Sequence, residues 1–194
     1  MFKVGAYTTV LIDNNQVKAI IKTLQEGYIY NGVKHRSNYQ VATILLLQAN
    51  LGCRIGDIVH LTVENIVFDG EAWRLNMTEQ KTGKKRLYVV ATPVKAIIDR
   101  WCEMKCITSG RLFTIEEPAV WKQIRAVTGF LGYKDVSAHS FRKNASLRVY
   151  MESGKDIALT AQYLNHSSPA TTLRYLKRSS KQMDELLSQS VVMV

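Results

Sequence analysis

The chain has 194 residues, 46% of them hydrophobic, so it can bury one sizeable core and a single domain is expected. Its 26 Lys and Arg residues against 16 Asp and Glu residues give a net charge of +10, which favours nucleic acid or an acidic membrane surface as a partner. The longest apolar run, Ile44–Leu47, is far too short to cross a membrane and the N-terminus lacks a signal peptide's apolar stretch, so we expect a soluble, cytoplasmic protein.

The three cysteines, Cys53, Cys102 and Cys106, have no spacing that suggests a disulfide framework, which agrees with a reducing compartment. Cys102 and Cys106 are one helical turn apart, a spacing that a metal site could use. No third ligand lies nearby, so we interpret them as small core residues and expect no metal site.

Helical periodicity dominates the first 60 residues. In IDNNQVKAIIKTL, Asp13 and Gln16 form a possible capping box ahead of an amphipathic pattern. The run SNYQVATILLLQANLG predicts a buried helix that opens on Ser37 and closes at Gly52, and a short helix over 55–61 should follow.

Residues 63–92 alternate apolar and polar side chains and contain two turn signals, Asp69-Gly70 and Thr82-Gly83. This pattern predicts a three-stranded antiparallel sheet. Helical pattern returns at TPVKAIIDRWCEMKC, where Thr92 can cap, and continues in the runs EPAVWKQIRAVTGFLG, HSFRKNASLRVYMESG, DIALTAQYLNH and PATTLRYLKRSSKQMDELL. The predicted fold class is therefore mainly α with a small antiparallel β-sheet, an α+β domain.

Several unusual polar residues interrupt these apolar elements. Each alone has an ordinary explanation, since an arginine can cap a helix, a histidine can pack in a core and a lysine can lie in a solvated turn. They are Arg54 with Asp57 in LGCRIGDIVHL, Lys81 in EQKTGKKR, His139 with Arg142 in AHSFRK, His166 in LNHSS, and Tyr175 in TTLRYL.

Taken in order, these residues resemble the catalytic pattern of the tyrosine recombinase, or phage integrase, family. That pattern is an Arg after a buried helix, a Lys in a hairpin turn, His-x-x-Arg, a later His or Trp, and a Tyr shortly beyond it. The segments GCRIGDIVHLTVENI, QKTGKKR and LNHSSPATTLRY are also similar to family segments, and the resemblance extends from Asp13 to about Ser180. It implies the catalytic-domain fold and a site-specific recombinase that acts on double-stranded DNA recombination sites.

The resemblance also implies the role of each catalytic residue. Arg54 and Arg142 would hold the non-bridging phosphate oxygens, and His139 and His166 would donate hydrogen bonds there. His139 would also serve as base, and Tyr175 would become joined to a 3′ phosphate of DNA.

Lys81 precedes Thr-Gly as the family's lysine does, so it would be the acid for the leaving 5′ oxygen, with Lys84 and Lys85 as competitors. Asp57 would orient Arg54 or His139. The expected DNA-binding residues are Lys84, Lys85, Lys143 and Arg174. With no P-loop or metal-ligand cluster in the sequence, we expect no cofactor.

The chain departs from the family pattern at Lys143-Asn144, where His-Thr or His-Ser is common, and at Asn165, where Gly is common. We assign residues 1–180 to the catalytic domain and 181–194 to a tail that docks between subunits. Family members usually add an N-terminal domain that clamps DNA, and we expect this chain to lack it. We expect a monomer in solution and a tetramer on DNA.

Two alternatives remain at this stage. The segment DIALTAQYLNHSSPATTLRYLKR also fits a helix-turn-helix of a basic transcription regulator. Type IB topoisomerases use a similar Arg, Lys, His and Tyr set to relax DNA, although the compact length and the spacing from LNHSS to Tyr175 favour recombination.

Overall fold

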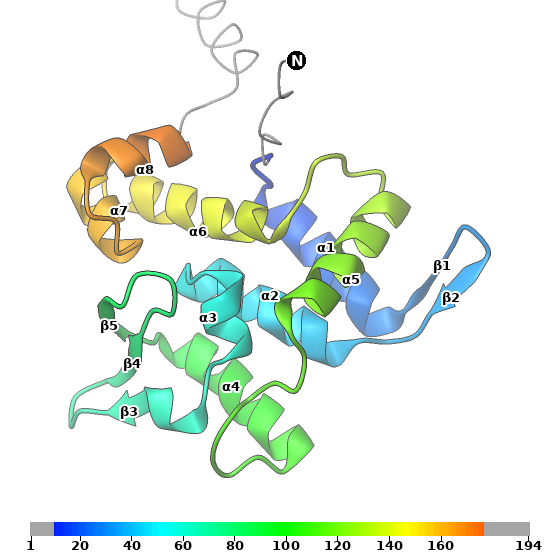
Figure 1. Ribbon diagram of the computed structural model, residues 1–194, viewed down its shortest axis with the longest axis horizontal. Coiled ribbons are helices and arrows are strands. Elements are labelled where there is room, and N and C mark those ends of the chain that lie inside the picture. Colours follow the sequence, from blue (N-terminus) through cyan, green and yellow to red (C-terminus); the bar gives the residue numbers. More distant parts are fainter. Residues whose placement is uncertain (1–9, 177–194) are drawn as a thin grey trace, which may run out of the picture.

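The computed structural model describes residues 10–176, without the side chains of residues 174–176. Within that range, eight α-helices are accompanied by two small antiparallel sheets (Figure 1). The helices are α1 (Asn14–Glu26), α2 (Tyr39–Leu51), α3 (Ile55–Val59), α4 (Thr92–Lys105), α5 (Glu117–Phe130), α6 (Ala138–Glu152), α7 (Ile157–Tyr163) and α8 (Pro169–Leu176). The predicted fold class, mainly helical with a small sheet, is confirmed.

The first two helices supply much of the core. The predicted capping box at Asp13 forms, with its carboxylate accepting from the Gln16 N–H at 2.8 Å and the Gln16 side chain accepting from the Asp13 N–H at 3.0 Å. Helix α2 is buried at eight of its 13 residues, as its apolar sequence predicts. It begins one residue later than expected, because Asn38, not Ser37, caps it by accepting from the Val41 N–H at 3.0 Å.

The predicted three-stranded sheet is present, in the order β3-β4-β5, with both pairs antiparallel. Its strands are β3 (Ile66–Phe68), β4 (Trp73–Thr78) and β5 (Lys85–Val89), and a 3₁₀ turn over Val63–Asn65 leads into it. Glycines with positive φ, Gly70 at +98° and Gly83 at +65°, lie in the two connections. The β4–β5 hairpin therefore carries Lys81 at its tip.

A second hairpin escaped the sequence prediction. Strands β1 (Tyr28–Tyr30) and β2 (Val33–His35) pair between α1 and α2, and they extend away from the body at the end opposite α7 and α8 (Figure 1). The signal was Asn31-Gly32, whose φ angles of +49° and +75° suit a two-residue hairpin turn.

Two local predictions on α4 are wrong. Thr92 does not cap this helix, because Ala91 occupies the N-cap position and Thr92 is already the first helical residue. Cys106 is exposed and Cys102 is only partly buried, so the pair are not core residues. Cys106 instead ends α4 in a left-handed conformation with φ +53°.

Three regions meet at one side of the molecule. Helix α6 packs against α2, and α7 and α8 pack against α6 and against each other (Figure 1). The β4–β5 hairpin lies between α3 and the α7–α8 turn, because the Gln80 N–H donates to Asp57 on α3 and the Lys84 ammonium donates to Ser167 in the turn. No helix in residues 10–176 is long and apolar enough to cross a membrane.

Candidate active site

Arg54 is the N-cap of α3 and lies two residues after Gly52, whose left-handed conformation ends α2. Its Nη1 lies 2.5 Å from the Glu79 carboxylate, and its side chain keeps 23% of its surface exposed. The carboxylate that Arg54 contacts is therefore Glu79. Asp57, which we expected to orient Arg54 or His139, accepts instead from the Gln80 N–H at 3.0 Å and so ties α3 to the hairpin.

Lys81 is exposed at the tip of the β4–β5 hairpin. Several contacts define its turn: the Gly83 N–H donates to the Glu79 carbonyl and the Glu79 N–H donates to the Lys84 carbonyl, both at 2.9 Å. The Thr82 hydroxyl donates to the Glu79 carboxylate at 2.7 Å. The turn that presents Lys81 is thus fastened at its base and leaves the ammonium facing outward.

Arg142 is buried on α6 and binds main-chain carbonyls. Nη1 donates to the Gly52 carbonyl at 2.6 Å and Nη2 donates to the Leu164 carbonyl at 2.8 Å. These carbonyls belong to the C-terminal ends of α2 and α7, where helix carbonyls lack intrahelical partners and favour cations. The guanidinium is held between the ends of two helices.

His166 follows α7 and lies beside Arg142, with Nε2 3.5 Å from Arg142 Nη2 and Nδ1 3.0 Å from the Thr172 hydroxyl on α8. Because a guanidinium only donates, Nε2 is the accepting nitrogen and the Nδ1–H donates to Thr172. Burial and the charges of Arg142 and Arg54 lower the pKa of His166 to about 4, so the imidazole is neutral at pH 7.

His139 lies in the first turn of α6. Its pKa is lowered by burial and then by the positive charges of Arg142, Lys81, Arg54 and Lys143. Those charges come from α6, the β4–β5 hairpin and the start of α3, and they all act on one imidazole. The structure therefore brings Arg54, Lys81, His139, Arg142 and His166 into one electrostatic neighbourhood.

Tyr175 and Arg174 lie on α8, and their side chains are outside the described residues. Helix α8 begins three residues after His166 and packs on α6 and α7, so the backbone carrying Tyr175 borders the site. Tyr163, a nearby tyrosine on α7, is partly buried, donates to the Asn50 carbonyl at 3.0 Å, and has its pKa raised by burial to about 12.

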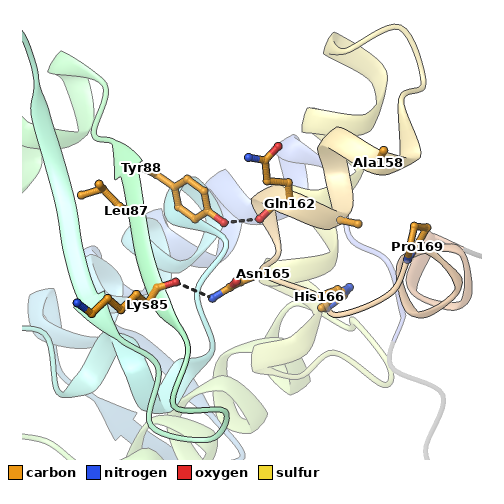
Figure 2. Close-up of a pocket in the computed structure, with 9 residues that line it drawn as sticks. Lys85, Leu87, Tyr88, Ala158, Gln162, Asn165, His166 and Pro169 are labelled. Carbon is orange, nitrogen blue, oxygen red and sulfur yellow. Dashed lines mark hydrogen bonds between the residues drawn. The ribbon is translucent and has the colours of Figure 1, made fainter.

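The other predicted DNA-binding residues differ in their surroundings. The Lys84 ammonium donates to the Ser167 hydroxyl at 2.7 Å, and Lys85 is exposed. Lys143 is partly buried, and burial lowers its pKa. Figure 2 shows the Lys85 carbonyl on β5 facing the turn after α7, where the Asn165 amide donates to it at 3.2 Å, while the Lys85 side chain points away from α7.

An open cavity of about 480 Å³ lies between β5 and the α7–α8 region (Figure 2). One wall is β5 with Leu87 and Tyr88, the other is α7 with Gln162, and His166 borders it. The Tyr88 hydroxyl bridges the walls by donating to the Gln162 carbonyl. The cavity therefore adjoins the side of the site that His166 forms.

Sequence reasoning missed two buried residues, Glu79 and Arg86, whose side chains have no exposed surface. Arg86 Nη1 lies 2.9 Å from Glu79, and Nη2 donates to the Tyr163 carbonyl at 2.5 Å and to the Leu51 carbonyl at 3.3 Å. The signal was the period of β5, in which Arg86 shares the inward phase with Val90. A charge at an inward position needs a buried partner.

Both departures from the family pattern have a structural reason. Asn165 has φ +56°, a left-handed conformation that glycine favours and that asparagine tolerates better than most residues. The Asn144 amide donates to the Ile12 carbonyl and to the Asn14 side chain, both at 3.0 Å, and so fastens α6 to the start of α1. Among residues 10–176, no group of three His, Cys, Asp or Glu side chains could hold a metal.

Comparison with known proteins identifies the class. The phage integrase family model matches residues 11–182. A protein of Bacillus subtilis that is named probable integrase/recombinase YoeC is 26% identical to this chain over 164 residues. The match covers 80% of this chain and 86% of that protein. The tyrosine recombinase XerA of Pyrococcus horikoshii is 24% identical over 89% of this chain, which spans 62% of that recombinase.

Among solved structures, a lambda integrase dimer bound to a COC′ core site superposes with a TM-score of 0.71 at 18% identity, covering 92% of this chain and 62% of that one. The fold is thus that of tyrosine recombinase catalytic domains. The chain belongs to the phage integrase family. It is a site-specific recombinase catalytic domain, and neither the helix-turn-helix regulator nor the type IB topoisomerase is favoured.

Proposed function

We propose that this domain cleaves and rejoins double-stranded DNA at recombination sites through a covalent 3′-phosphotyrosine on Tyr175. The observation that carries the proposal is the convergence of four positive charges, from Arg54, Lys81, Arg142 and Lys143, on the imidazole of His139. Such a concentration of charge suits a phosphodiester, whose oxygens gain negative charge as a nucleophile adds.

Arg54 and Arg142 have complementary tasks in this mechanism. Arg54 is partly exposed and gives the site a cation at the surface. Arg142 is buried, and its guanidinium is held in place by the Gly52 and Leu164 carbonyls. Each guanidinium has five donors in a rigid fork, so it can bind non-bridging phosphate oxygens while it keeps its structural contacts. Holding the phosphate between two fixed forks positions it without a metal ion.

His139 is the proposed base for Tyr175. A tyrosine with an ordinary pKa near 10 is a poor nucleophile at pH 7, so a neutral acceptor and nearby cations are needed to favour the phenolate. The lowered pKa keeps His139 neutral and able to accept the proton. His166 can donate a further hydrogen bond to the phosphate from Nε2 if its contact with Arg142 is replaced and the imidazole takes the other tautomer, in which Nδ1 accepts from the Thr172 hydroxyl.

Lys81 is the proposed acid for the 5′ oxygen that leaves. Its exposure at the hairpin tip and its influence on the pKa of His139 support this assignment over Lys84, whose ammonium binds Ser167. A flexible ammonium suits a proton donor that must reach a leaving group. Rejoining runs the same steps backwards, because a 5′ hydroxyl can attack the phosphotyrosine.

The proposal extends to assembly and location. Lys84, Lys85, Lys143 and Arg174 contact the DNA backbone, residues 181–194 dock on a neighbouring subunit, and a monomer in solution becomes a tetramer on DNA. Neither metal nor cofactor is needed, and the protein acts in the cytoplasm.

The decisive experiment uses Tyr175→Phe and a nicked suicide DNA substrate, which traps the covalent intermediate. The variant keeps the ring, so it should bind DNA as the unmutated protein does but form no denaturation-resistant adduct. Tyr150→Phe, on α6, is the matched control and should form the adduct at the unmutated rate. An adduct that survives Tyr175→Phe would contradict the proposal.

A further inference from the structure

We propose that Glu79, which carries none of the expected catalytic roles, is a positioning residue that fixes Arg54 and the turn carrying Lys81 relative to each other. This inference rests on the proposed function, because it assigns Glu79 a part in the same cleavage reaction. It starts from a buried carboxylate with three side-chain contacts from three different segments.

The two oxygens of Glu79 have separate tasks. Oε1 lies 2.9 Å from the buried Arg86, and Oε2 accepts from Arg54 at 2.5 Å and from Thr82 at 2.7 Å. Oε2 therefore joins the phosphate-binding arginine to the turn that presents Lys81. Charge-assisted contacts of this kind are short and directional, so movement of the turn is coupled to movement of the guanidinium.

The ionised state of Glu79 is consistent with this task. Burial raises its pKa, but hydrogen bonds from Thr82 and Arg54 and the charges of Arg54 and Arg86 bring the pKa below its ordinary value. The carboxylate is thus charged at neutral pH and accepts from all three donors at once.

Arg86 fixes Glu79 in turn. Its Nη2 donates to the carbonyls of Leu51 and Tyr163, which end α2 and α7. Arg54 follows shortly after the end of α2, and His166 follows shortly after the end of α7. A single buried pair, Arg86 with Glu79, therefore relates the hairpin to the two chain segments that carry Arg54 and His166.

The arrangement predicts a specific kinetic defect. Without the Glu79 carboxylate, Arg54 and Lys81 lose their common anchor, and a displacement of about 1 Å at a reacting group costs on the order of 10²-fold in rate. Glu79→Gln should slow adduct formation roughly 10- to 100-fold. DNA affinity should change less than about threefold, since one internal carboxylate contributes little to phosphate contacts.

A modified substrate separates positioning from loss of folded protein. A 5′-bridging phosphorothiolate leaves without a proton, so it does not need Lys81. If Glu79 positions Lys81, the Glu79→Gln defect should be smaller on this substrate than on ordinary DNA, and the part that remains is the part that comes from Arg54. A merely structural defect lowers the active fraction equally on both, so equal defects, or no defect, would overturn the proposal.

Two further variants complete the design. Thr82→Val removes one hydroxyl from an exposed residue and leaves the buried pair intact, so it should fold normally and give a smaller defect, about threefold to tenfold, that disappears on the phosphorothiolate. If Glu79→Gln does not fold, Thr82→Val tests the proposal in its place. Cleavage at the unmutated rate by Thr82→Val would then contradict the proposed link between Glu79 and the turn that carries Lys81.

Asp69→Asn is the matched control. It removes a carboxylate that pairs with Arg74 on the same sheet but at the far turn, and both substrates should react at the unmutated rate. Failure of the unmutated protein to form any adduct would count against the proposed function instead. In that case the contact between Glu79 and Arg54 can be tested without DNA by NMR. The chemical shift of the Arg54 guanidinium should change in Glu79→Gln and remain unchanged in Asp69→Asn.

Discussion

The guanidinium of Arg142 is held by main-chain carbonyls, and this choice of partners matters for its chemistry. Carbonyl dipoles hold the side chain without neutralising its charge, and under the proposed function that charge is available to the DNA phosphate. Arg86, which does pair with a carboxylate, is fully buried and has a structural task. Arg142 and Arg86 thus differ in the partners described for them: main-chain carbonyls for Arg142, and a carboxylate together with carbonyls for Arg86.

The proposed role of Lys81 as the acid for the leaving 5′ oxygen can be tested by a single substitution. Lys81→Ala should bind DNA nearly as well as the unmutated protein, because one lysine contributes little to total phosphate affinity, but cleavage should slow by about 10²- to 10⁴-fold. A 5′-bridging phosphorothiolate should restore the rate. Rescue of Lys84→Ala or Lys85→Ala in place of Lys81→Ala would move the acid to another residue of the hairpin.

The histidines predict how stability depends on pH. His139 and His166 both have pKa values lowered from 6.5, His166 to about 4, so between pH 6.5 and 4 the unfolded chain binds protons that the folded chain does not. The free energy of unfolding should therefore fall as pH falls through this window, as measured by urea denaturation. His166→Asn should flatten the dependence, and an unchanged slope in that variant would contradict the assignment.

At the scale of elements, Gly52 at the C-terminus of α2 has several structural tasks. Its φ of +61° ends the helix, its carbonyl accepts from Arg142, and a Cβ here would lie 2.5 Å from the Tyr163 hydroxyl. A side chain at this position is therefore excluded twice, by backbone conformation and by the packing of α7 against the turn.

Gly52→Ala should consequently destabilise the protein by roughly 2 to 4 kcal/mol, from left-handed strain together with overpacking. Gly132→Ala is a suitable comparison, because Gly132 has φ +72° but no atom within 4 Å of an added Cβ, and it should cost only about 1 to 2 kcal/mol. Thermal unfolding of both variants measures the difference. Equal losses would mean that the contact with Tyr163 carries no energy.

The elements that sequence predicted well are those whose signals are local. The capping box at Asp13, the buried pattern of α2 and the alternation of β4 and β5 each lie within one short segment. The β1–β2 hairpin was missed because Tyr28–Tyr30 and Val33–His35 are only three residues each, too short for a periodicity to register. Its Asn31-Gly32 turn was the available signal.

The candidate site also has residues that the sequence made recognisable and residues that it did not. Arg54, Lys81, His139, Arg142 and His166 were recognisable from their order in the chain, and the structure brings them into one neighbourhood. Glu79 was not recognisable, because its importance comes from contacts with Arg54 and Arg86, which lie in different elements. Asp57 was expected to orient Arg54 or His139, and the contact of Arg54 with Glu79 was not foreseen, because proximity along a helix is visible in sequence and proximity across a hairpin is not.

At the scale of the whole molecule, the tail supplies a prediction about assembly. Residues 181–194 lie outside the described residues, and their sequence ends in the apolar run Val191–Val194. If this tail docks on a neighbouring subunit, deleting it should spare binding to a single site and impair strand exchange between two sites. Gel-shift and recombination assays measure the two steps, and equal recombination by the truncated protein would remove the idea.

The contacts of Arg86 and Arg142 with the ends of α2 and α7 also set an order of events in folding. Arg142 and Gly52 are 90 positions apart, and Arg86 and Tyr163 are 77 positions apart. Contacts that close such long loops form late, whereas helices and hairpins form from neighbouring residues. A chain emerging from the ribosome should thus acquire most of its helices before the side chains of the candidate site come together. Under the proposed function, it could not cleave DNA until the segment through Leu164 has been made and has docked.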